Sequence, residues 1–524
     1  MEYLKQFKFI VAHNAKFELQ WLFRAGVKLE TILCFDSLLC DYIISSNRRY
    51  PLDLNSVASR RGLACKNPLV ENLIHNGVCP SCIPQHLLLN YCAQDVILTE
   101  QVFLRQREEL RAAGQLPLLY TKCLFTPLLA EMELNGIHLD NTRVTEVYDS
   151  YFKELAEVEN ELYNITNGIN IGSSQQVARF IYSDLGFEEL KDKRGTPIRN
   201  KPSKAFPDGT PKTDEPTLSQ LRPTTRRQKE FLALRLRRSH LSKAITTYLE
   251  RFVEALRSSQ GVLHGKFNQA VVQTGRLSGN LQQIPRDFKK LFSARREGRL
   301  MGEGDFPQLE FRAAVFLGDD DAGRESVANG EDVHAFTASV IGVSRQDAKE
   351  HTFKPLYGGQ SGTPSEKRYY KAFKEKYSGV AETQEKWKLE VLKSKELVLP
   401  TGHRFYWPDT AMDSRGYVKN TTNICNYPVQ YFATAEIAPI ASFMLWHHMK
   451  AYKMLSFIVN CIHDSTITEL NPEERELYKK LIVQAYTEDV YWYLKKVYNI
   501  DFDVALGCDI KIGPFWGEPE KKNG

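Results

Sequence analysis

The pattern of apolar and polar positions divides the chain into segments. Residues 1–110 combine a strand-like run, FKFIVAH, with a helix that ends near Gly26 and a long amphipathic helix, LLLNYCAQDVILTEQVFLRQREEL. These elements predict a small α/β unit. Residues 111–262 have mainly helical spacing, and after residue 262 strand-like and helical segments alternate to the end. At 524 residues the chain is too long to fold around a single hydrophobic core, and it should contain two to four domains.

Two basic stretches lie within the helical part. Residues 191–217 hold five prolines, two glycines and seven Lys or Arg residues, and this composition predicts a mobile basic loop. The following helix interleaves cationic and apolar positions, with candidate phosphate contacts at Arg235, Arg237, Arg238 and Lys243. The pattern fits a solvated helix face as well as a surface that contacts phosphates, and both interpretations stay open.

Residues 457–470, FIVNCIHDSTITEL, predict a β-hairpin. Apolar positions precede His463, Asp464 and Ser465, and a two-residue alternation follows them. A hairpin tip usually carries Gly or Asn, so an imidazole and a carboxylate there need a reason. A plain surface turn is the alternative, because Asp and Ser are common in turns.

A second carboxylate follows a short strand in GEGDFPQLEFRAAVFLG. Asp305 ends the strand, Pro307 is expected in the first turn of the next helix, and Glu310 follows. Divalent cations of the hard type prefer carboxylate oxygens, and a two-metal site needs ligands from separate elements. Asp305 and Asp464 could therefore form such a site, with Arg276 nearby in a turn rich in Gly and Ser.

The segment RQDAKEHTFKPLYGG places four side chains on one helix face. Arg345, Lys349, Phe353 and Tyr357 follow at four-residue intervals and span about 18 Å. Two cations followed by two aromatic rings could hold a triphosphate at one end and stack on a base and sugar at the other. Pro355 should bend this helix and displace the Tyr357 end.

Composition excludes few classes of protein. Apolar content is 42%, charged content is 25%, and the net charge of +5 permits a nucleic-acid partner without requiring one. No run approaches 18 apolar residues, so a soluble cytoplasmic protein with ten reduced cysteines is expected. Cys79 and Cys82 could form a metal knuckle with Cys65 or Cys92, although a plain loop is favoured.

These motifs together resemble DNA polymerase family A, the group of bacterial DNA polymerase I, and its bacteriophage branch most. DFPQLEFR, RQDAKEHTFKPLYGG and IHDS resemble the three polymerase motifs, and TGRLSGNLQQIP, DVHAFTA and NYPVQ match further signatures. The implied fold is α+β, a right hand of thumb, palm and fingers behind a partial α/β exonuclease domain of ribonuclease H type. The implied divisions are 1–110 for the exonuclease-like domain, 111–262 for the thumb and connecting helices, 263–318 and 426–524 for the palm, and 319–425 for the fingers.

The resemblance also implies a role for each candidate residue. Asp305, Asp464 and the Phe306 carbonyl would hold two Mg²⁺ ions, for which Mn²⁺ could substitute. Glu310 would be the steric gate that excludes a ribose 2′-hydroxyl. The incoming dNTP would be bound by His334, Arg345, Lys349, Phe353 and Tyr357, and Lys349 would also protonate the leaving pyrophosphate. Primer–template DNA would be contacted by Arg276, Asn426, Gln430, His463 and Lys243. Many relatives carry Glu where this chain has Ser465, which indicates that a third acid is dispensable.

The N-terminal segment resembles two of three 3′–5′ exonuclease motifs. VAHNAKFELQWL contains Asn14 and Glu18, and YCAQDV contains Tyr91 and Asp95. In relatives an Asp-x-Glu motif lies further upstream, and Glu18 stands where Asp is usual. A two-metal exonuclease needs convergent carboxylates, so we expect no proofreading by this chain alone. The alternatives are that Asp36 or Asp41 substitutes, or that another polypeptide completes the domain.

Two other classes of protein compete with a DNA polymerase. A single-subunit RNA polymerase would also pair two aspartates, although Glu310 and the exonuclease-like segment argue against it. A non-catalytic DNA-binding replication subunit would have no reason to keep both aspartates and the cationic helix face. The expected partners are primer–template DNA and dNTPs, with an accessory replication factor as a further candidate and no membrane. We expect a monomeric polymerase in the cytoplasm of a phage host, with an organelle as the alternative location.

Overall fold

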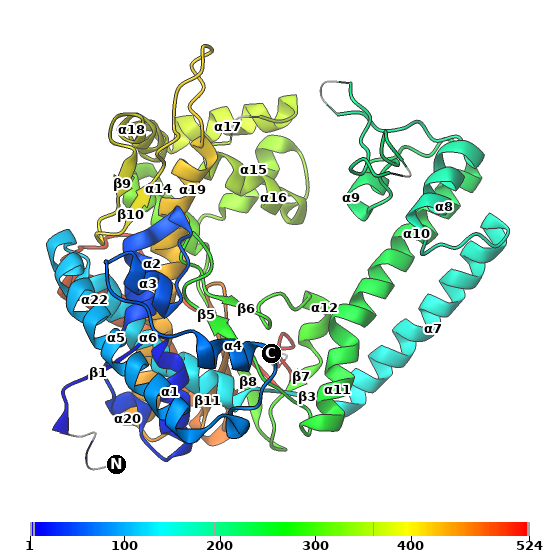
Figure 1. The fold of residues 1–524 in the computed structure, drawn as a ribbon. Coiled ribbons are helices and arrows are strands. Elements are labelled where there is room, and N and C mark those ends of the chain that lie inside the picture. Colours follow the sequence, from blue (N-terminus) through cyan, green and yellow to red (C-terminus); the bar gives the residue numbers. More distant parts are fainter. Residues whose placement is uncertain (1–2, 4–5, 193–194, 205, 360, 521–524) are drawn as a thin grey trace. The chain divides into compact units, whose positions relative to one another are not determined.

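The computed structural model describes residues 3, 6–192, 195–204, 206–359 and 361–520, without the side chains of residues 346, 347, 349 and 350. The chain forms two compact units, which are Met1–Ile137 with His264–Gly524, and His138–Leu263. Strand β3 (Ile137–Leu139) lies where the sequence passes from one to the other. Figure 1 shows the elements along the chain.

The first unit begins with a small α/β segment. Strands β1 (Ile10–Ala12) and β2 (Cys34–Asp36) pair in parallel, with Val11 opposite Phe35. The sequence between them forms α1 (Ala15–Arg24) and a short 3-10 turn, η2 (Leu29–Thr31). The helices that follow are α2 (Ser37–Ser45), η3 (Ser46–Arg48), α3 (Leu54–Ser59), α4 (Leu69–His75), η4 (Pro80–Cys82), α5 (Gln85–Ala113) and α6 (Leu116–Asn135). Helix α6 packs against α1, so residues 116–135 belong to the first unit.

The centre of the first unit is a four-stranded antiparallel sheet with strand order β11-β12-β8-β13. Its strands are β8 (Leu300–Asp305), β11 (Phe457–Ile462), β12 (Ser465–Leu470) and β13 (Asp509–Gly513). The register places Ser465 and Asp509 on either side of Asp305. Asp305 therefore ends a strand that is paired on both edges, which fixes its backbone firmly.

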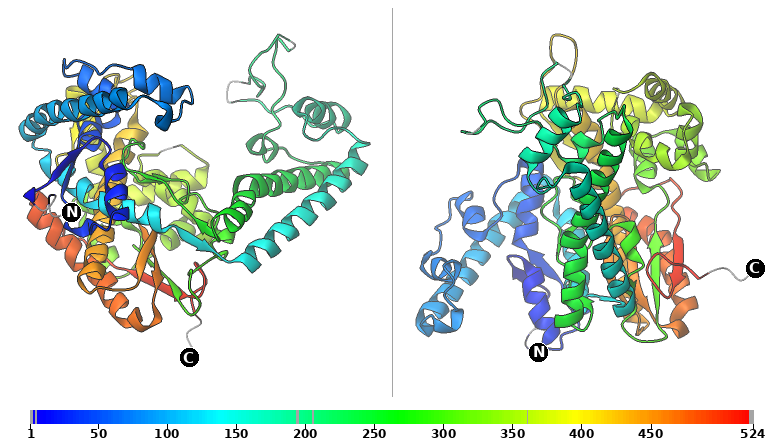
Figure 2. Two further views of the ribbon diagram at one scale, coloured as in Figure 1. Left: turned by 60° about the horizontal axis from the view of Figure 1, so that its bottom comes forward. Right: turned by 90° about the vertical axis from the view of Figure 1, so that its right-hand side faces the viewer.

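Helices cover the sheet and extend from it (Figures 1 and 2). The helices α20 (Ala438–Ala451), α21 (Arg475–Tyr486) and α22 (Glu488–Tyr498) pack together, and α6 packs against α20 and β11. The other helices of this half are α12 (Arg286–Lys289), α13 (Leu309–Leu317), α14 (Asp321–Ala328), α15 (Val333–Ile341), α16 (Arg345–Leu356), α17 (Pro364–Lys376), α18 (Ser378–Ser394), α19 (Thr421–Gln430) and the π-helical segment η7 (Tyr431–Ile437). Two short pairs of strands are β5 (Phe267–Asn268) with β6 (Ser278–Gly279), and β9 (Glu396–Val398) with β10 (Arg404–Tyr406). A further short strand, β7 (Phe292–Ser293), belongs to neither pair.

The second unit is built on two long helices, α7 (Asn141–Thr166) and α10 (Arg226–Ala244), which lie side by side in both figures. The helical path of α10 continues through the π-helical segment η6 (Ile245–Leu249) into α11 (Glu250–Ser258). Its remaining elements are α8 (Ser174–Arg179), η5 (Phe180–Asp184), α9 (Glu215–Leu218) and β4 (Val262–Leu263). An apolar cluster that includes Leu162, Phe180 and Phe231 holds these helices together.

Several predictions about elements can be compared with this fold. The hairpin at 457–470, the long helix α5 and the mixed α+β class are confirmed. The predicted placement of Pro307 in the first turn of the next helix is wrong. Helix α13 begins only at Leu309, after Gln308 has taken a left-handed conformation with φ 54°. In the predicted loop, Arg199 pairs with Pro211 in a β-bridge and its side chain with Glu189 at 2.7 Å; its mobility stays a prediction.

Candidate active site

The central sheet brings Asp305 and Asp464 together. Asp305 ends β8, and Asp464 lies in the tip of the β11–β12 hairpin, directly before the residue that pairs with Asp305. The two carboxyl groups are close enough to hydrogen-bond to each other. Two acids that are far apart in the sequence thus meet because antiparallel pairing places the end of one strand beside the start of the next.

Burial and mutual repulsion shape the charge of this pair. Burial raises the pKa of Asp305, and the nearby charge of Glu303 adds to the rise. Burial also raises the pKa of Asp464, and the charge of Asp305 adds to it. Lys289 and Lys511 approach Glu303 at 3.2 and 3.9 Å and offset part of the negative charge. A divalent cation between the two aspartates would relieve their repulsion, so the donor set fits such an ion.

The hairpin tip explains the imidazole that precedes Asp464. His463 has φ 55°, a conformation that costs about 1–2 kcal/mol for a residue with a side chain. The residue is exposed, but partial desolvation of its ring lowers its pKa, and the charges of Arg276 and Lys289 lower it further. A strained backbone at His463, beside two partly buried carboxyl groups, favours a functional role for the tip over a plain surface turn.

Arg276 and Glu310 form an ion pair beside the two aspartates. Glu310 lies in the first turn of α13, and Arg276 follows a tight turn at 272–275. Burial raises the pKa of Glu310 to about 7. The guanidinium of Arg276 acts in the opposite direction, and because it is in direct contact we take Glu310 to be ionised. The family resemblance implies that Arg276 contacts DNA and that Glu310 contacts the nucleotide, and the structure adds that the two side chains contact each other.

Helices α15 and α16 carry the predicted nucleotide-binding residues. His334 is buried and its Nδ1 lies 3.0 Å from Thr352 Oγ1. Arg345, at the start of α16, forms an ion pair with Asp332, the N-cap of α15. Lys349 lies on the same helix, but its side chain is outside the described residues.

The aromatic end of α16 is ordered differently from the prediction. The rings of Phe353 and Tyr357 are stacked with centroids 5.9 Å apart, and the Tyr357 N–H donates to the Phe353 carbonyl at 3.0 Å. The predicted displacement of Tyr357 is therefore wrong. Pro355 stands in the last turn, where the buried Gln384 of α18 donates to the carbonyls of Pro355 and Leu356 and satisfies the helix end.

Helix α19 places Asn426 and Gln430 one turn apart. The Asn426 Oδ1 is buried and has no hydrogen-bond partner among the described residues. Gln430 ends α19 where the chain passes into the π-helical segment η7. π-Helical segments are frequent at functional sites. A buried acceptor without a partner is costly unless something else supplies a donor, so Asn426 is a good candidate for contact with a ligand.

The cationic residues of the second unit differ from one another. Arg237 donates two bonds of 2.6 Å to Glu154 of α7, and Arg238 lies 2.9 Å from Glu159. These pairs hold the two long helices together. Lys243 is exposed, and no bond of its side chain is found among the described residues. For Arg237 and Arg238 these ion pairs favour a structural role over phosphate contact, whereas Lys243 is free to contact phosphates.

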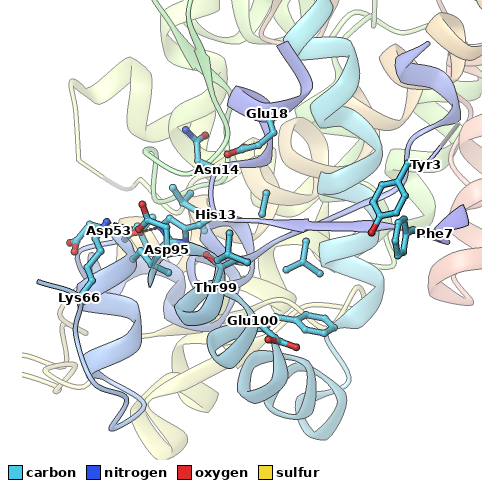
Figure 3. Close-up of a pocket in the computed structure, with 17 residues that line it drawn as sticks. Tyr3, Phe7, His13, Asn14, Glu18, Asp53, Lys66, Asp95, Thr99 and Glu100 are labelled. Carbon is cyan, nitrogen blue, oxygen red and sulfur yellow. Dashed lines mark hydrogen bonds and ion pairs between the residues drawn. The ribbon is translucent and has the colours of Figure 1, made fainter. Parts of the chain in front are cut away.

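The N-terminal segment contains a pocket of about 1340 Å³. Figure 3 shows Asp53, Lys66 and Asp95 gathered at one end and Tyr3 and Phe7 at the other. The Lys66 Nζ donates to Asp95 Oδ1 at 2.7 Å and to the Tyr91 hydroxyl at 2.8 Å. Burial alone would lower the pKa of Lys66, but these two bonds outweigh it and raise the pKa. The carboxylate of Asp95 is thus already paired with an ammonium group, a contact that no sequence pattern indicated.

Two other predicted members of the exonuclease-like site, Asn14 and Glu18, line the same pocket as Asp95. Asn14 has φ 70° and caps α1, and Glu18 has a buried Oε2 without a partner among the described residues. Asp36 accepts from four backbone N–H groups, those of Asn14, Ala15, Leu38 and Leu39. Asp41 is paired with Arg60 and with Arg61. The charge of Asp36 acts on Glu18, and substitution by Asp36 or Asp41 for the acids of the first exonuclease motif stays an untested alternative.

The described residues contain no group of three or more His, Cys, Asp or Glu side chains arranged to hold a metal ion, and the Asp305–Asp464 pair would need a backbone carbonyl as a further ligand. Within the same part of the chain, no helix combines the length and apolar character of a membrane span.

Comparisons with known proteins point to one family. A family model described as DNA polymerase family A matches residues 141–518. DNA polymerase I of Bacillus subtilis is 25% identical over 517 residues, covering 92% of this chain and 55% of that protein. The thermostable DNA polymerase I of Thermus filiformis is 27% identical, covering 75% of this chain and 47% of that protein. The chain thus spans about half the length of these curated relatives. The solved POL domain of Pol1 from M. smegmatis, in complex with DNA primer-template and dNTP, matches with a TM-score of 0.76 at 21% identity, covering 98% of this chain and 86% of that one.

Proposed function

The chain belongs to DNA polymerase family A, and from this premise we propose that it adds dNTPs to the 3′ end of a DNA primer as a template directs. It shares the mixed helix and strand fold of the polymerase domain with which it matches. The observation that carries the proposal is the meeting of the Asp305 and Asp464 carboxyl groups at the end of β8 and the tip of the hairpin. Phosphoryl transfer requires mainly positioning and charge neutralisation, which such a pair supports.

Asp305, Asp464 and the Phe306 carbonyl are the groups that would hold two Mg²⁺ ions, or Mn²⁺ in their place. Burial is the main cause of the raised pKa values of the two aspartates, and the charge of Asp305 adds to the rise at Asp464; a cation between the carboxylates would offset both effects, which supports this assignment. When bound, such ions neutralise the triphosphate charge and favour ionisation of the primer hydroxyl. The paired strands of the sheet hold both carboxyl groups in place for this purpose.

The cationic and aromatic residues of α15 and α16 would bind the incoming nucleotide. Arg345, Lys349 and His334 would contact the triphosphate, and Lys349 would donate a proton to the leaving pyrophosphate. Arg345 is exposed at its ion pair with Asp332, so a triphosphate can compete for it. The stacked rings of Phe353 and Tyr357 offer a flat surface for the base and sugar.

The residues around Arg276 would contact DNA and select the sugar. Glu310 would exclude the ribose 2′-hydroxyl, and its ion pair with Arg276 supports this by holding the carboxylate in one place. Arg276, Asn426 and Gln430 would contact the minor-groove edges of the newest base pairs, and His463 would lie by the primer terminus. The partnerless Asn426 Oδ1 supports such a contact.

The divisions of the chain follow from the same premise. Residues 263–318 and 426–524 would form the palm, 319–425 the fingers and 111–262 the thumb and connecting helices, with Lys243 on the path of the DNA backbone. Residues 1–110 would be an exonuclease-like domain. We further propose a monomeric enzyme of bacteriophage replication in the host cytoplasm, served by an accessory factor or by a polypeptide that completes the exonuclease-like domain. The motif resemblance supports this assignment.

The exonuclease-like domain would not degrade DNA in this chain by itself. Asp95 is paired with Lys66, and the ammonium group stands where a cation would otherwise be attracted. Incubation of the chain with Mg²⁺ and labelled single-stranded DNA should leave the 3′ end intact. Progressive shortening that is abolished by Asp95→Ala would contradict this part of the proposal.

Primer extension tests the proposal against its two alternatives. The purified chain should extend a primer with dNTPs and fail with NTPs, because Glu310 leaves no room for the 2′-hydroxyl. Extension with NTPs at equal or higher rates would instead favour the single-subunit RNA polymerase. DNA binding without any extension would favour the non-catalytic subunit.

A further inference from the structure

The turn that precedes Arg276 is held by the N-terminal segment. The Gly275 N–H donates to the Val272 carbonyl at 2.8 Å and closes the turn. The hydroxyl of Tyr42, in α2, donates to the same carbonyl at 2.7 Å. Residues 272–276 therefore receive part of their hydrogen bonding from a segment that precedes them by more than two hundred positions.

Both polar atoms of the Gln273 side-chain amide form hydrogen bonds to other segments. Its Nε2 donates to the Asn47 carbonyl at 2.8 Å. Its Oε1 accepts from Arg49 Nη2 at 3.0 Å and from the Tyr427 hydroxyl at 2.8 Å. A guanidinium can only donate and a carbonyl can only accept, so the orientation of the amide is fixed by its partners. One amide thus joins three segments, which are the end of η3, the turn before Arg276 and helix α19.

The turn also fits closely against the π-helical segment that follows α19. Gly275 has φ 72°, and a Cβ at this position would lie 2.6 Å from Ala435 Cβ and 2.7 Å from the Tyr431 ring. Tyr431 stacks on His403 with centroids 3.7 Å apart, and Ser46 Oγ lies 3.2 Å from His403 Nε2. Residues 46–49 therefore contact the turn directly through Gln273. They also contact it indirectly, through His403, which stacks on the Tyr431 ring beneath Gly275.

The side chain that depends on this turn is Arg276. It forms the ion pair with Glu310, and its charge also acts on Asp464. Because Arg276 is three residues from Gln273 on a tight turn, a shift of the turn moves the guanidinium directly. Displacements of about 1 Å in a positioning group can reduce rates by about a hundredfold.

From these contacts we propose that Gln273 is a positioning residue of the active site. Through it, Asn47 and Arg49 of the N-terminal segment hold Arg276 and α19 in a fixed relation. The inference rests on the proposed function of Arg276, and it gives the N-terminal segment a role in nucleotide addition that requires no exonuclease chemistry. Gln273 contacts neither the aspartates nor Glu310 in any described bond, so it acts only through Arg276 and α19.

A double-mutant cycle separates positioning from general stabilisation. Gln273→Met keeps the length of the side chain and removes all three bonds. We expect single-turnover incorporation of a dNTP to fall about tenfold, with no further loss when Gln273→Met is combined with Arg276→Ala. Arg111→Met, which removes one exposed ion pair with Glu108 in the last turns of α5, is the matched control and should leave the rate unchanged. Losses that multiply in the double variant would overturn the inference.

Hydrogen exchange provides a readout that does not depend on catalysis. In Gln273→Met the Gly275 amide should exchange at least about tenfold faster, while the amides of the β11–β12 hairpin stay as protected as in the unaltered chain. Unchanged exchange at Gly275 would overturn the positioning role. If the unaltered chain extends no primer, the proposed function fails, and the exchange measurement still decides whether Gln273 fixes the turn.

Discussion

Gly304 lies one residue before Asp305, at the point where α21 packs directly on β8. A Cβ at position 304 would lie 2.1 Å from Ile482 Cδ1, 3.0 Å from Ile482 Cγ1 and 3.3 Å from Cys508 Sγ. Ile482 is fully buried, so its side chain can move only by disturbing its neighbours. Gly304→Ala should therefore overpack this layer and lower the free energy of unfolding by about 1–3 kcal/mol.

The same structure predicts a compensating change. Ile482→Val removes Cδ1, the atom in the closest contact, and by itself should cost about 0.5–1.5 kcal/mol. In the double variant Gly304→Ala/Ile482→Val the clash is relieved, so its stability should lie within about 1 kcal/mol of Ile482→Val alone. Because β8 carries Asp305, the single-turnover rate should fall several-fold in Gly304→Ala and recover in the double variant.

Urea unfolding followed by circular dichroism measures the stabilities, and rapid-quench primer extension measures the rates. Gly507→Ala is the matched control, since a Cβ there would meet only Pro307, at an ordinary 3.4 Å. Strictly additive stability losses for Gly304→Ala and Ile482→Val would refute the reasoning that close packing of α21 on β8 positions Asp305.

Three further predictions follow from the proposed roles. Glu310→Ala should admit ribonucleotides, because removal of one clash of about 2–4 kcal/mol lowers discrimination by two to three orders of magnitude; unchanged rNTP incorporation would exclude Glu310 as the gate. Phe353→Tyr should raise chain termination by dideoxynucleotides, since the added hydroxyl can replace the missing 3′-hydroxyl, and equal ddNTP sensitivity of both forms would count against this. Lys243→Ala should reduce the slope of log K against log salt by about 0.9, while Arg237→Ala, whose guanidinium is held by Glu154, should leave the slope nearly unchanged; the reverse order would place the DNA elsewhere.

Local patterns in the sequence predicted those parts of the site that depend on local structure. The alternation around His463 and Asp464 predicted the hairpin, and the four-residue spacing predicted the helix that carries Arg345 and Phe353. Both elements are present with these residues in the expected places. Periodicity could identify them because the side-chain directions of a strand or helix follow from backbone geometry alone. The roles assigned to these residues stay predictions.

Contacts between distant side chains could not be predicted in this way. The pairing of Lys66 with Asp95, and of Arg276 with Glu310, depends on how segments pack in three dimensions. The error at Tyr357 has a similar cause. The local rule for Pro355 was sound, but Gln384, in another helix, satisfies the helix end that the rule expected to be disrupted.

The central claim is that Asp305 and Asp464 together support nucleotidyl transfer. Asp464→Asn keeps the size of the side chain and removes its charge, and Asp501→Asn, at an exposed ion pair with Lys495, is the matched control. Loss of about 4 kcal/mol of transition-state stabilisation corresponds to about a thousandfold lower single-turnover rate. We predict this loss in Asp464→Asn, with primer–template affinity within about twofold of the unaltered chain. Extension by Asp464→Asn at the unaltered rate would contradict the account.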